Sequence, residues 1–142
     1  MKSINWEDPD EPINDNDILE VEKLLGFSFP LDYVEIAKQY HGATIEPSRF
    51  NYGEEGFRGY IDSMLSFDSE EYESIQRLSL EFLKNRDMPD KVVPFGMDAA
   101  GNLICFDYSK NSRNPCVVYW LHEENRLAYI CNTFTDLINK LN

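Results

Sequence analysis

Residues 92–121 read VVPFGMDAAGNLICFDYSKNSRNPCVVYWL, and this stretch decides the fold. Three runs rich in β-branched, aromatic and other apolar residues, at 92–95, 102–108 and 116–121, are separated by turn-forming residues, and Gly96 should stop the first run. Three strands joined by short loops should pair as an antiparallel meander. Because the runs are almost continuously apolar, both faces of this sheet should be covered, and helices from elsewhere in the chain must pack on it.

The segments before this stretch have the apolar spacing of amphipathic helices. A first helix, capped by Asp15 or Asn16, should run to Gly26, a natural stop. A second helix should open at Pro30, whose missing N–H costs nothing in a first turn, and should end near Gly42. These two helices form a unit that can cover one face of the sheet.

A longer third helix is predicted to begin at residue 68 and to extend to about residue 84. Asp68 or Ser69 would cap this helix. Glu70, Glu71 and Glu73 would lie in its first turn, where carboxylates complement the positive end of the helix dipole.

Between the second and third helices the sequence favours less regular structure. Residues 43–45 and 60–67 have the composition of strands. Residues 46–59 indicate a loop, because glycines interrupt every pattern there, and Glu54 and Glu55 lie at its tip.

The remaining segments complete a prediction of fold class. Residues 127–131 should add a fourth strand, and Thr133 should cap a final helix. We predict an α+β fold, with a twisted antiparallel sheet and helices packed around it in a single domain. Residues 1–14 should form an irregular acidic arm, and residues 15–142 the domain itself.

The charge balance restricts the partners. The chain of 142 residues holds 13 Lys and Arg against 26 Asp and Glu, a formal net charge of −13. Binding to nucleic acid through its phosphates needs a basic face, so we expect no nucleic acid partner. The acidity indicates either a basic partner or simply a means of staying dispersed in water.

The cysteines and the apolar runs indicate the compartment. Cys105, Cys116 and Cys131 are an odd number, and each lies within an apolar strand-like run, where a thiol behaves as a small buried hydrophobe. This pattern predicts a reducing, cytoplasmic setting. We expect neither a signal peptide nor a membrane span, since no run of about 18 consecutive apolar residues occurs.

Motifs for phosphate or metal binding are incomplete. Gly96 and Gly101 have the spacing of half a P-loop, but Asn102 follows where a P-loop has lysine, which favours a turn. Asp98, Asn102 and Asp107 fit neither an EF-hand nor a known transition-metal pattern. We therefore predict no metal and no cofactor.

The candidates for nucleophilic catalysis are equally sparse. His41 and His122 are the only histidines, and no sequence signature ties either of them to a nucleophile or completes a zinc site with the cysteines. A three-dimensional pairing of a histidine with Cys105 or Cys116 stays open, as does a groove near Asp98 and His122 for a small ligand. The prediction is that the protein is not an enzyme.

Several separated motifs, in this order, resemble the SUKH superfamily in its Smi/Knr branch. They are FPLDY at residues 29–33, VPFG at 93–96, GNLICFD at 101–107, PCVVYWLHE at 115–123 and NTFTDLI at 132–138. The resemblance extends over residues 15–141 and implies an α+β domain, in agreement with the pattern of runs and caps.

The resemblance also implies a class of function. Bacterial members resemble immunity proteins that bind and neutralise polymorphic toxins, often nucleases, whereas the branch takes its name from a fungal regulator of cell-wall synthesis. The chain is therefore predicted to be an immunity protein, or antitoxin, that binds a basic toxin domain through an acidic surface. The alternative is a regulatory protein-interaction module with no toxin.

The acidic stretches supply the candidate contacts with a toxin. One is the arm at residues 7–11, one is the tip at residues 54–55, and one is the predicted helix start at residues 68–73. The candidate toxin-binding residues are Asp68, Glu70, Glu71, Tyr72, Glu73, Glu54 and Glu55. Carboxylates would pair with Lys or Arg of the toxin, and Tyr72 or Tyr52 would supply a buried aromatic anchor.

Overall fold

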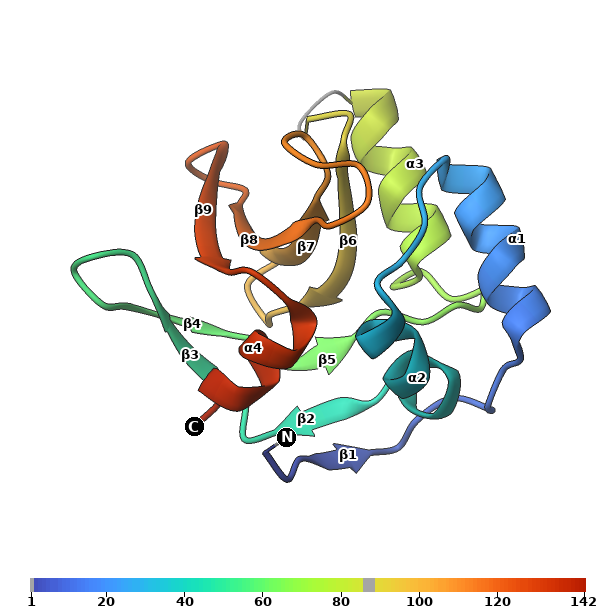
Figure 1. The fold of residues 1–142 in the computed structure, drawn as a ribbon, viewed down its shortest axis with the longest axis horizontal. Helices are drawn as coiled ribbons and strands as arrows, with labels where there is room; N and C mark the ends of the chain where they lie inside the picture. The colour runs from blue at the N-terminus through green and yellow to red at the C-terminus, as the bar shows by residue number, and fades with distance from the viewer. Residues whose placement is uncertain (1, 86–88) are drawn as a thin grey trace.

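The computed structural model describes residues 2–85 and 89–142, and of residues 82–85 only the backbone. In chain order the elements are β1 (Asn5–Glu7), α1 (Asp15–Leu25), α2 (Leu31–Tyr40), β2 (Thr44–Glu46), β3 (Arg49–Tyr52), β4 (Phe57–Tyr60), β5 (Ser63–Met64), α3 (Ile75–Asn85), β6 (Val92–Met97), β7 (Leu103–Asp107), β8 (Cys116–Leu121), β9 (Arg126–Cys131) and α4 (Phe134–Lys140). In this described part, one sheet has the order β1-β2-β5-β6-β7-β8-β9, and β3 and β4 form a separate hairpin (Figure 1). The α+β prediction is confirmed.

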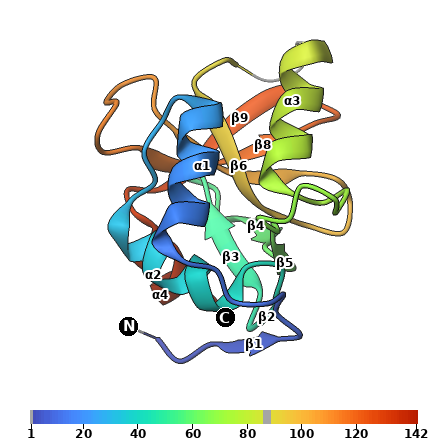
Figure 2. The same cartoon turned by 90° about the vertical axis from the view of Figure 1, so that its right-hand side faces the viewer.

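The central meander is confirmed too. β6 pairs with β7, β7 with β8 and β8 with β9, and every pairing is antiparallel. Nearly all residues of β6, β7 and β8 are buried, as their continuous apolar runs predict. Helices α1 and α3 lie together on one side of the molecule, and the β3–β4 hairpin projects from the other (Figure 1, Figure 2).

The expected stop at Gly96 is wrong, because β6 continues to Met97. Gly96 pairs with Ile104 on one side and with Met64 on the other. A Cβ atom at Gly96 would lie 2.6 Å from the Cδ1 atom of Ile61, so the glycine allows the segment before β5 to approach the strand closely. This glycine serves strand packing and does not end the strand.

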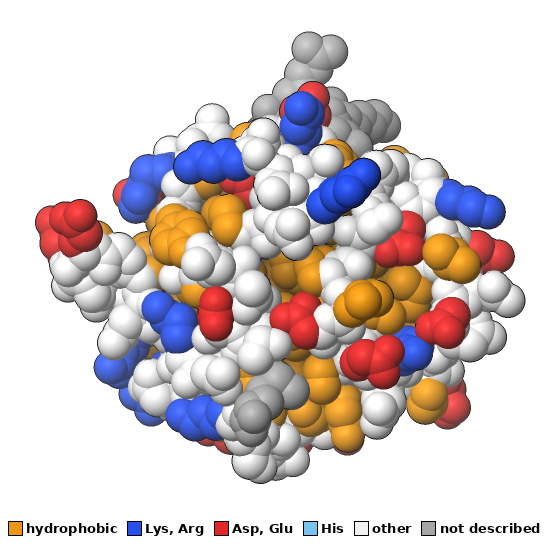
Figure 3. Space-filling view, viewed as in Figure 1, with side chains coloured by type: hydrophobic (Ala, Val, Ile, Leu, Met, Phe, Trp, Pro, Cys, Tyr) orange, Lys and Arg blue, Asp and Glu red, His pale blue; other side chains and the backbone are white. Residues whose placement is uncertain are grey.

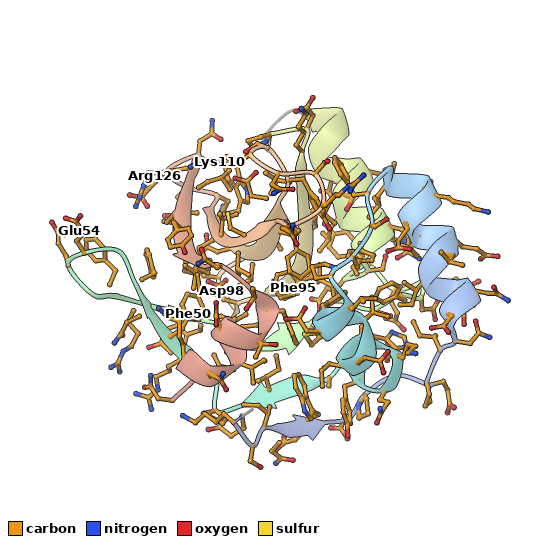
Figure 4. All side chains as sticks on the ribbon, in the orientation of Figure 1. Phe50, Glu54, Phe95, Asp98, Lys110 and Arg126 are labelled. Atoms are coloured by element: carbon orange, nitrogen blue, oxygen red, sulfur yellow. The ribbon has the colours of Figure 1, made fainter. Side chains whose placement is uncertain are left out.

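The core is a cluster of aromatic rings around Tyr33 of α2. Its ring centroid lies 5.5 Å from that of Phe95 in β6, 5.2 Å from Phe106 in β7 and 5.4 Å from Phe134 in α4. Phe95 and Phe106 stack at 4.2 Å, and Figure 4 shows Phe95 well inside the fold. Helices α2 and α4 are thus anchored on the meander by edge-to-face ring contacts.

Helix α1 is capped one residue earlier than predicted. The side chain of Asn14, and not that of Asp15 or Asn16, accepts the backbone N–H of Asp17, while the Asp17 carboxylate accepts the N–H of Asn14. This reciprocal capping box satisfies two backbone donors at once. Gly26 ends the helix in the left-handed conformation, as predicted.

The limits of α2 and α4 agree with the sequence. Pro30 is the N-cap of α2, and the helix ends at Tyr40, just before His41 and Gly42. The hydroxyl of Thr133 accepts the backbone N–H of Asp136 at 3.0 Å and caps α4, as predicted.

The predicted helix start at Asp68 is wrong, since α3 begins at Ile75. The chain between them is a loop whose ends meet: Ser66 donates its N–H to the carbonyl of Glu73 and accepts the N–H of Ile75, at 3.0 and 2.9 Å. The cap is Ser74, whose hydroxyl oxygen accepts an N–H from the first turn of α3. The acidic residues therefore precede the helix.

The loop predicted at residues 46–59 is wrong in part, because it contains the β3–β4 hairpin. A Cβ atom at Gly59 would lie 2.6 Å from the ring of Phe50, so the glycine makes room for a buried side chain within a strand pair. Glu54 and Glu55 lie in the turn of the hairpin, at the tip that the sequence indicated.

Two further segments differ in extent from the prediction. The strand expected at residues 60–67 is divided, since Tyr60 ends β4 and only Ser63 and Met64 form β5. The arm at residues 1–14 is not irregular throughout, since β1 pairs with β2 and its Trp6 stacks on Tyr40 at a centroid distance of 5.3 Å.

Tyrosine-to-phenylalanine substitutions should have opposite effects at two core positions. The Tyr33 hydroxyl is buried and has no hydrogen-bond partner among the described residues, whereas the Tyr108 hydroxyl donates to the Ser28 carbonyl at 2.8 Å. We expect Tyr33→Phe to raise the free energy of unfolding by about 1 kcal/mol and Tyr108→Phe to lower it by about 1 kcal/mol. Urea unfolding at pH 7 measures both. A loss of stability in Tyr33→Phe would mean that its hydroxyl is satisfied in solution.

Candidate protein-binding groove

A groove of about 830 Å³ lies between α1, α3, the N-terminal arm and the loop that follows β5. Figure 2 shows α1 and α3 side by side on the face that carries it. Its lining residues are Asp10, Glu11, Pro12, Ile13, Asp17, Glu20, Val21, Leu24, His41, Phe67, Asp68, Ser69, Gln76 and Leu80. We call this feature the α1–α3 groove.

One face of α1 forms a wall of the α1–α3 groove. Asp17, Glu20, Val21 and Leu24 follow one another at helical spacings of three, one and three residues, which places them on the same face. Leu24 is 56% exposed, and Leu80, which reaches the groove from α3, is 53% exposed. Leu24 lies in the groove and is not among the buried residues of α1, which are Ile18 and Val21.

The rim of the α1–α3 groove is acidic. Five of its lining residues are carboxylates, and none is Lys or Arg. Asp17 takes part in the capping box, and Asp68 accepts the N–H of Glu70. The ion pairs found in the described part of the chain include neither Glu11 nor Glu20. The groove therefore combines apolar side chains with negative charge that no cation within it offsets.

A buried histidine joins the walls of the groove. His41 is 2% exposed; its Nδ1 atom accepts the backbone N–H of Phe67 at 2.9 Å, and its Nε2 atom lies 2.7 Å from the carbonyl of Glu11. Since Nδ1 is an acceptor, the proton is on Nε2, which donates to Glu11. His41 thus connects the arm, the end of α2 and the segment after β5. Sequence reasoning found no role for it.

The arm is held against the end of α2 by further contacts. Asp10 donates its N–H to the carbonyl of His41, and Ile13 donates to that of Lys38, both at 2.9 Å. Gly42 has a φ of +79°, and a Cβ atom there would lie 2.5 Å from the Asp10 carboxylate. The glycine therefore allows the arm to close one side of the α1–α3 groove.

The structure brings some predicted contact residues to this groove and separates others from it. Asp68 lines the groove, and Glu70, Glu71 and Glu73 lie exposed on the same loop. Glu54 lies at the outer tip of the hairpin, on the other side of the molecule from α1 and α3 (Figure 1, Figure 4). Glu55 belongs to the same turn.

Tyr72 lies outside the lining of the α1–α3 groove. It is 61% exposed, and its hydroxyl donates to Glu81 at 3.1 Å, an interaction that raises the pKa of the phenol. Sequence reasoning missed Glu20, Leu24 and Leu80. The four-residue spacing of Glu20 and Leu24 was visible in the sequence, but only the packing of α1 beside α3 shows that Leu80 lines the same groove.

A second hollow, of about 640 Å³, lies between the hairpin and β9. Phe57 and Tyr129 are exposed there, and Figure 3 shows hydrophobic atoms gathered over β9. Its lining contains Arg126 and Lys140 as well as Glu54, so it has no single sign of charge. The predicted anchor Tyr52 also lines it, with its ring packed on Tyr119 at 5.3 Å.

The polar side chains around Asp98 form hydrogen bonds that hold two turns together. The Asp98 carboxylate accepts both the backbone and the side-chain N–H of Asn102 at 2.9 Å and the hydroxyl of Tyr119 at 2.5 Å. Ring atom Nε2 of His122 lies 2.8 Å from the carbonyl of Ala100. The hollow beside His122 has a volume of only about 210 Å³. These contacts join the β6–β7 turn to the start of the β8–β9 turn.

Burial affects the chemistry of the three thiols. It raises the pKa of Cys105 well above its usual value and that of Cys131 to about 12, and it also raises the pKa of Cys116. All three are therefore protonated at neutral pH, the unreactive form of a thiol. Among the residues that the structure describes, no group of three His, Cys, Asp or Glu side chains could hold a metal ion.

Comparison with known families identifies the class of protein. The model of the SMI1 / KNR4 family (SUKH-1) matches residues 12–140, so the chain belongs to this family and the resemblance seen in its motifs is confirmed. Membership supports a role of the toxin-immunity or Smi1/Knr4 type in general. No curated protein shows significant sequence similarity to the chain. None of the helices described is long and apolar enough to cross a membrane.

Two glycine-to-alanine variants should separate the arm contact from backbone strain. Gly26 and Gly42 both have positive φ, +83° and +79°, but only at Gly42 would a Cβ atom meet another residue, Asp10. We expect Gly26→Ala to lower the free energy of unfolding by about 1 kcal/mol, and Gly42→Ala to lower it by at least about 1 kcal/mol more. Hydrogen exchange at the amide of Ile13 should speed up only in Gly42→Ala. Equal exchange in both variants would contradict the role given to Gly42.

Proposed function

We propose that the protein is an immunity protein that binds a basic toxin domain, the substrate-binding face of a nuclease, through the α1–α3 groove. The observation that carries this proposal is the groove itself, where five carboxylates surround exposed leucines and no Lys or Arg is present. The family supports such a role in general.

The chemistry of a nuclease makes it a suitable partner for this groove. An enzyme that binds nucleic acid needs a basic surface for the phosphates. An acidic groove would attract that surface and exclude the nucleic acid by occupying its site. The net charge of −13 adds long-range attraction, which raises the rate of association.

We propose that the protein acts by binding and catalyses no reaction, without a metal or cofactor. The protonated state of the buried thiols supports this, because a neutral thiol is a poor nucleophile. The engagement of the Asp98 carboxylate in turn hydrogen bonds also supports it. An odd number of cysteines in buried strands favours a reducing compartment, and we propose the cytoplasm.

A regulatory module is the second candidate, because the matching family model carries the SMI1 / KNR4 name. Both candidates need a surface for binding proteins, and the α1–α3 groove serves either one. The genes beside this one distinguish them. A large toxin gene directly upstream supports immunity, whereas a locus without a toxin gene supports regulation.

The first experiment is capture of the tagged protein from its native host, with and without about 0.5 M salt, followed by mass spectrometry. We expect one basic, toxin-like protein that is recovered poorly in salt, because exposed charge pairs are screened. Recovery of cell-wall or signalling proteins only would overturn the immunity proposal in favour of the regulatory one.

Charge reversal should locate the interface. The double variant Glu11→Lys/Glu20→Lys places two cations on the groove rim, and we expect at least about a ten-fold loss of toxin affinity at low salt. The double variant Glu54→Lys/Glu55→Lys makes the same change in net charge at the hairpin tip and should have a much smaller effect. Titration calorimetry measures both. A greater loss from the tip variant would move the interface to the hairpin.

A further inference from the structure

We infer that the α1–α3 groove receives an amphipathic, basic α-helix, in which a short apolar stripe is flanked by Lys and Arg. This inference deepens the proposed function and rests on the same groove, but it concerns the form of the bound segment. It would hold for a toxin or for any other protein partner with such a helix.

The walls of the groove favour a helix over an extended strand. An extended peptide gains affinity mainly by hydrogen bonding to the free edge of a sheet. Two walls here are α1 and α3, whose backbone groups bond within each helix. On the arm, the N–H groups of Asp10 and Ile13 are already bonded to the end of α2. A partner would therefore contact these walls mainly through side chains and not through backbone hydrogen bonds. Side-chain contacts of this kind are how an amphipathic helix binds in a groove.

The size of the apolar contact suits a short helical stripe. Asp17 and Leu24 are seven residues apart on α1, about 10 Å along the helix axis, which matches about two turns of a bound helix. Leu24 and Leu80 project from opposite helices and are each more than half exposed. Buried Val21 and Phe67 lie deeper in the lining. Leucine-sized side chains at helical spacing in the partner would cover these leucines.

The position of the charges defines the flanks of the bound helix. Asp17 and Glu20 lie on α1, Asp10 and Glu11 on the arm, and Asp68 on the loop before α3. Acidic side chains thus come from three different segments around the apolar lining. A helix with Lys or Arg on both sides of its apolar stripe would meet carboxylates on more than one side, which is the charge complementarity that selects a basic helix.

The groove is already formed in the free protein. The capping box fixes the start of α1, and the hydrogen bonds of His41 hold the arm to the segment at Phe67. A binding site whose walls are fixed loses little conformational entropy when the ligand arrives. The ordering cost then falls on the partner, and it is smallest if the partner segment is already a helix.

Two synthetic peptides test the inference directly. Both have about 14 residues of Lys, Leu and Ala in the same composition. The first places its leucines on one helical face, and the second distributes them around the helix. We expect the first to bind at least ten-fold more tightly in a fluorescence titration, with NMR shift changes centred on Leu24 and Leu80. Equal affinities, or shift changes elsewhere, would overturn the inference.

Leucine variants provide the matched control. Leu24→Gln/Leu80→Gln keeps the charge and the helix propensity while removing the apolar contact. This double variant should lower the affinity for the first peptide at least ten-fold. Leu31→Gln changes a leucine that is 80% exposed on α2 and outside the groove lining, and should have no effect. Equal weakening by both variants would overturn the inference, because the effect would not depend on the groove. Circular dichroism of each variant verifies that its fold is retained.

The outcomes distinguish this inference from the proposed function. If the Leu24→Gln/Leu80→Gln variant neutralises the captured toxin with wild-type affinity, the helix-in-groove mode is overturned and immunity stands. If the first peptide binds in the groove but the host contains no basic toxin partner, the mode stands and immunity is overturned.

Discussion

The buried imidazole of His41 is the contact on which the candidate site depends. It accepts a backbone N–H from Phe67 and donates to the carbonyl of Glu11, so three segments far apart in sequence meet at one ring. An unmade hydrogen bond at a buried polar group is expensive, and this forces the arm and the segment after β5 to keep their positions together. Phe67 in turn packs at 6.4 Å on Tyr33, the centre of the aromatic core. The wall of a surface groove is in this way fixed by the interior of the domain.

The groove is also where the structure keeps apolar surface exposed. Leu24 and Leu80 could have been polar without harm to the core, because the buried side of α1 is already supplied by Ile18 and Val21. Exposed leucines scattered singly need no explanation, but Leu24 and Leu80 both line the same groove of about 830 Å³. The surrounding carboxylates keep that surface hydrated and repel the other acidic copies of the chain. They leave it available to a basic partner.

The strength of local signals explains how much of the fold the sequence predicted. The meander and the cap at Thr133 depend on neighbouring residues, and both are confirmed. The start of α3 was placed too early because acidic residues in a loop look like those of a first helical turn. The sequence does not predict the hairpin because a glycine such as Gly59 is typical of loops, whereas here it makes room for Phe50 within a strand pair. That contact joins residues nine positions apart and has no pattern of its own in the sequence.

The candidate site was less predictable than the fold for a related reason. Acidity of the arm and of residues 68–73 was visible in the sequence, but the approach of Asp10, Glu11 and Asp68 to one groove depends on His41 and Gly42, which connect segments about 30 residues apart. Charge alone could not separate these residues from Glu54 and Glu55, which are equally acidic and lie on the other side of the molecule. The difference is that the carboxylates of the α1–α3 groove lie beside the exposed apolar side chains of Leu24 and Leu80. Carboxylates attract many basic molecules, whereas the apolar lining of the α1–α3 groove fits few of them. Selectivity for a partner therefore arises from the shape of the groove, and the rate of association arises from the charge.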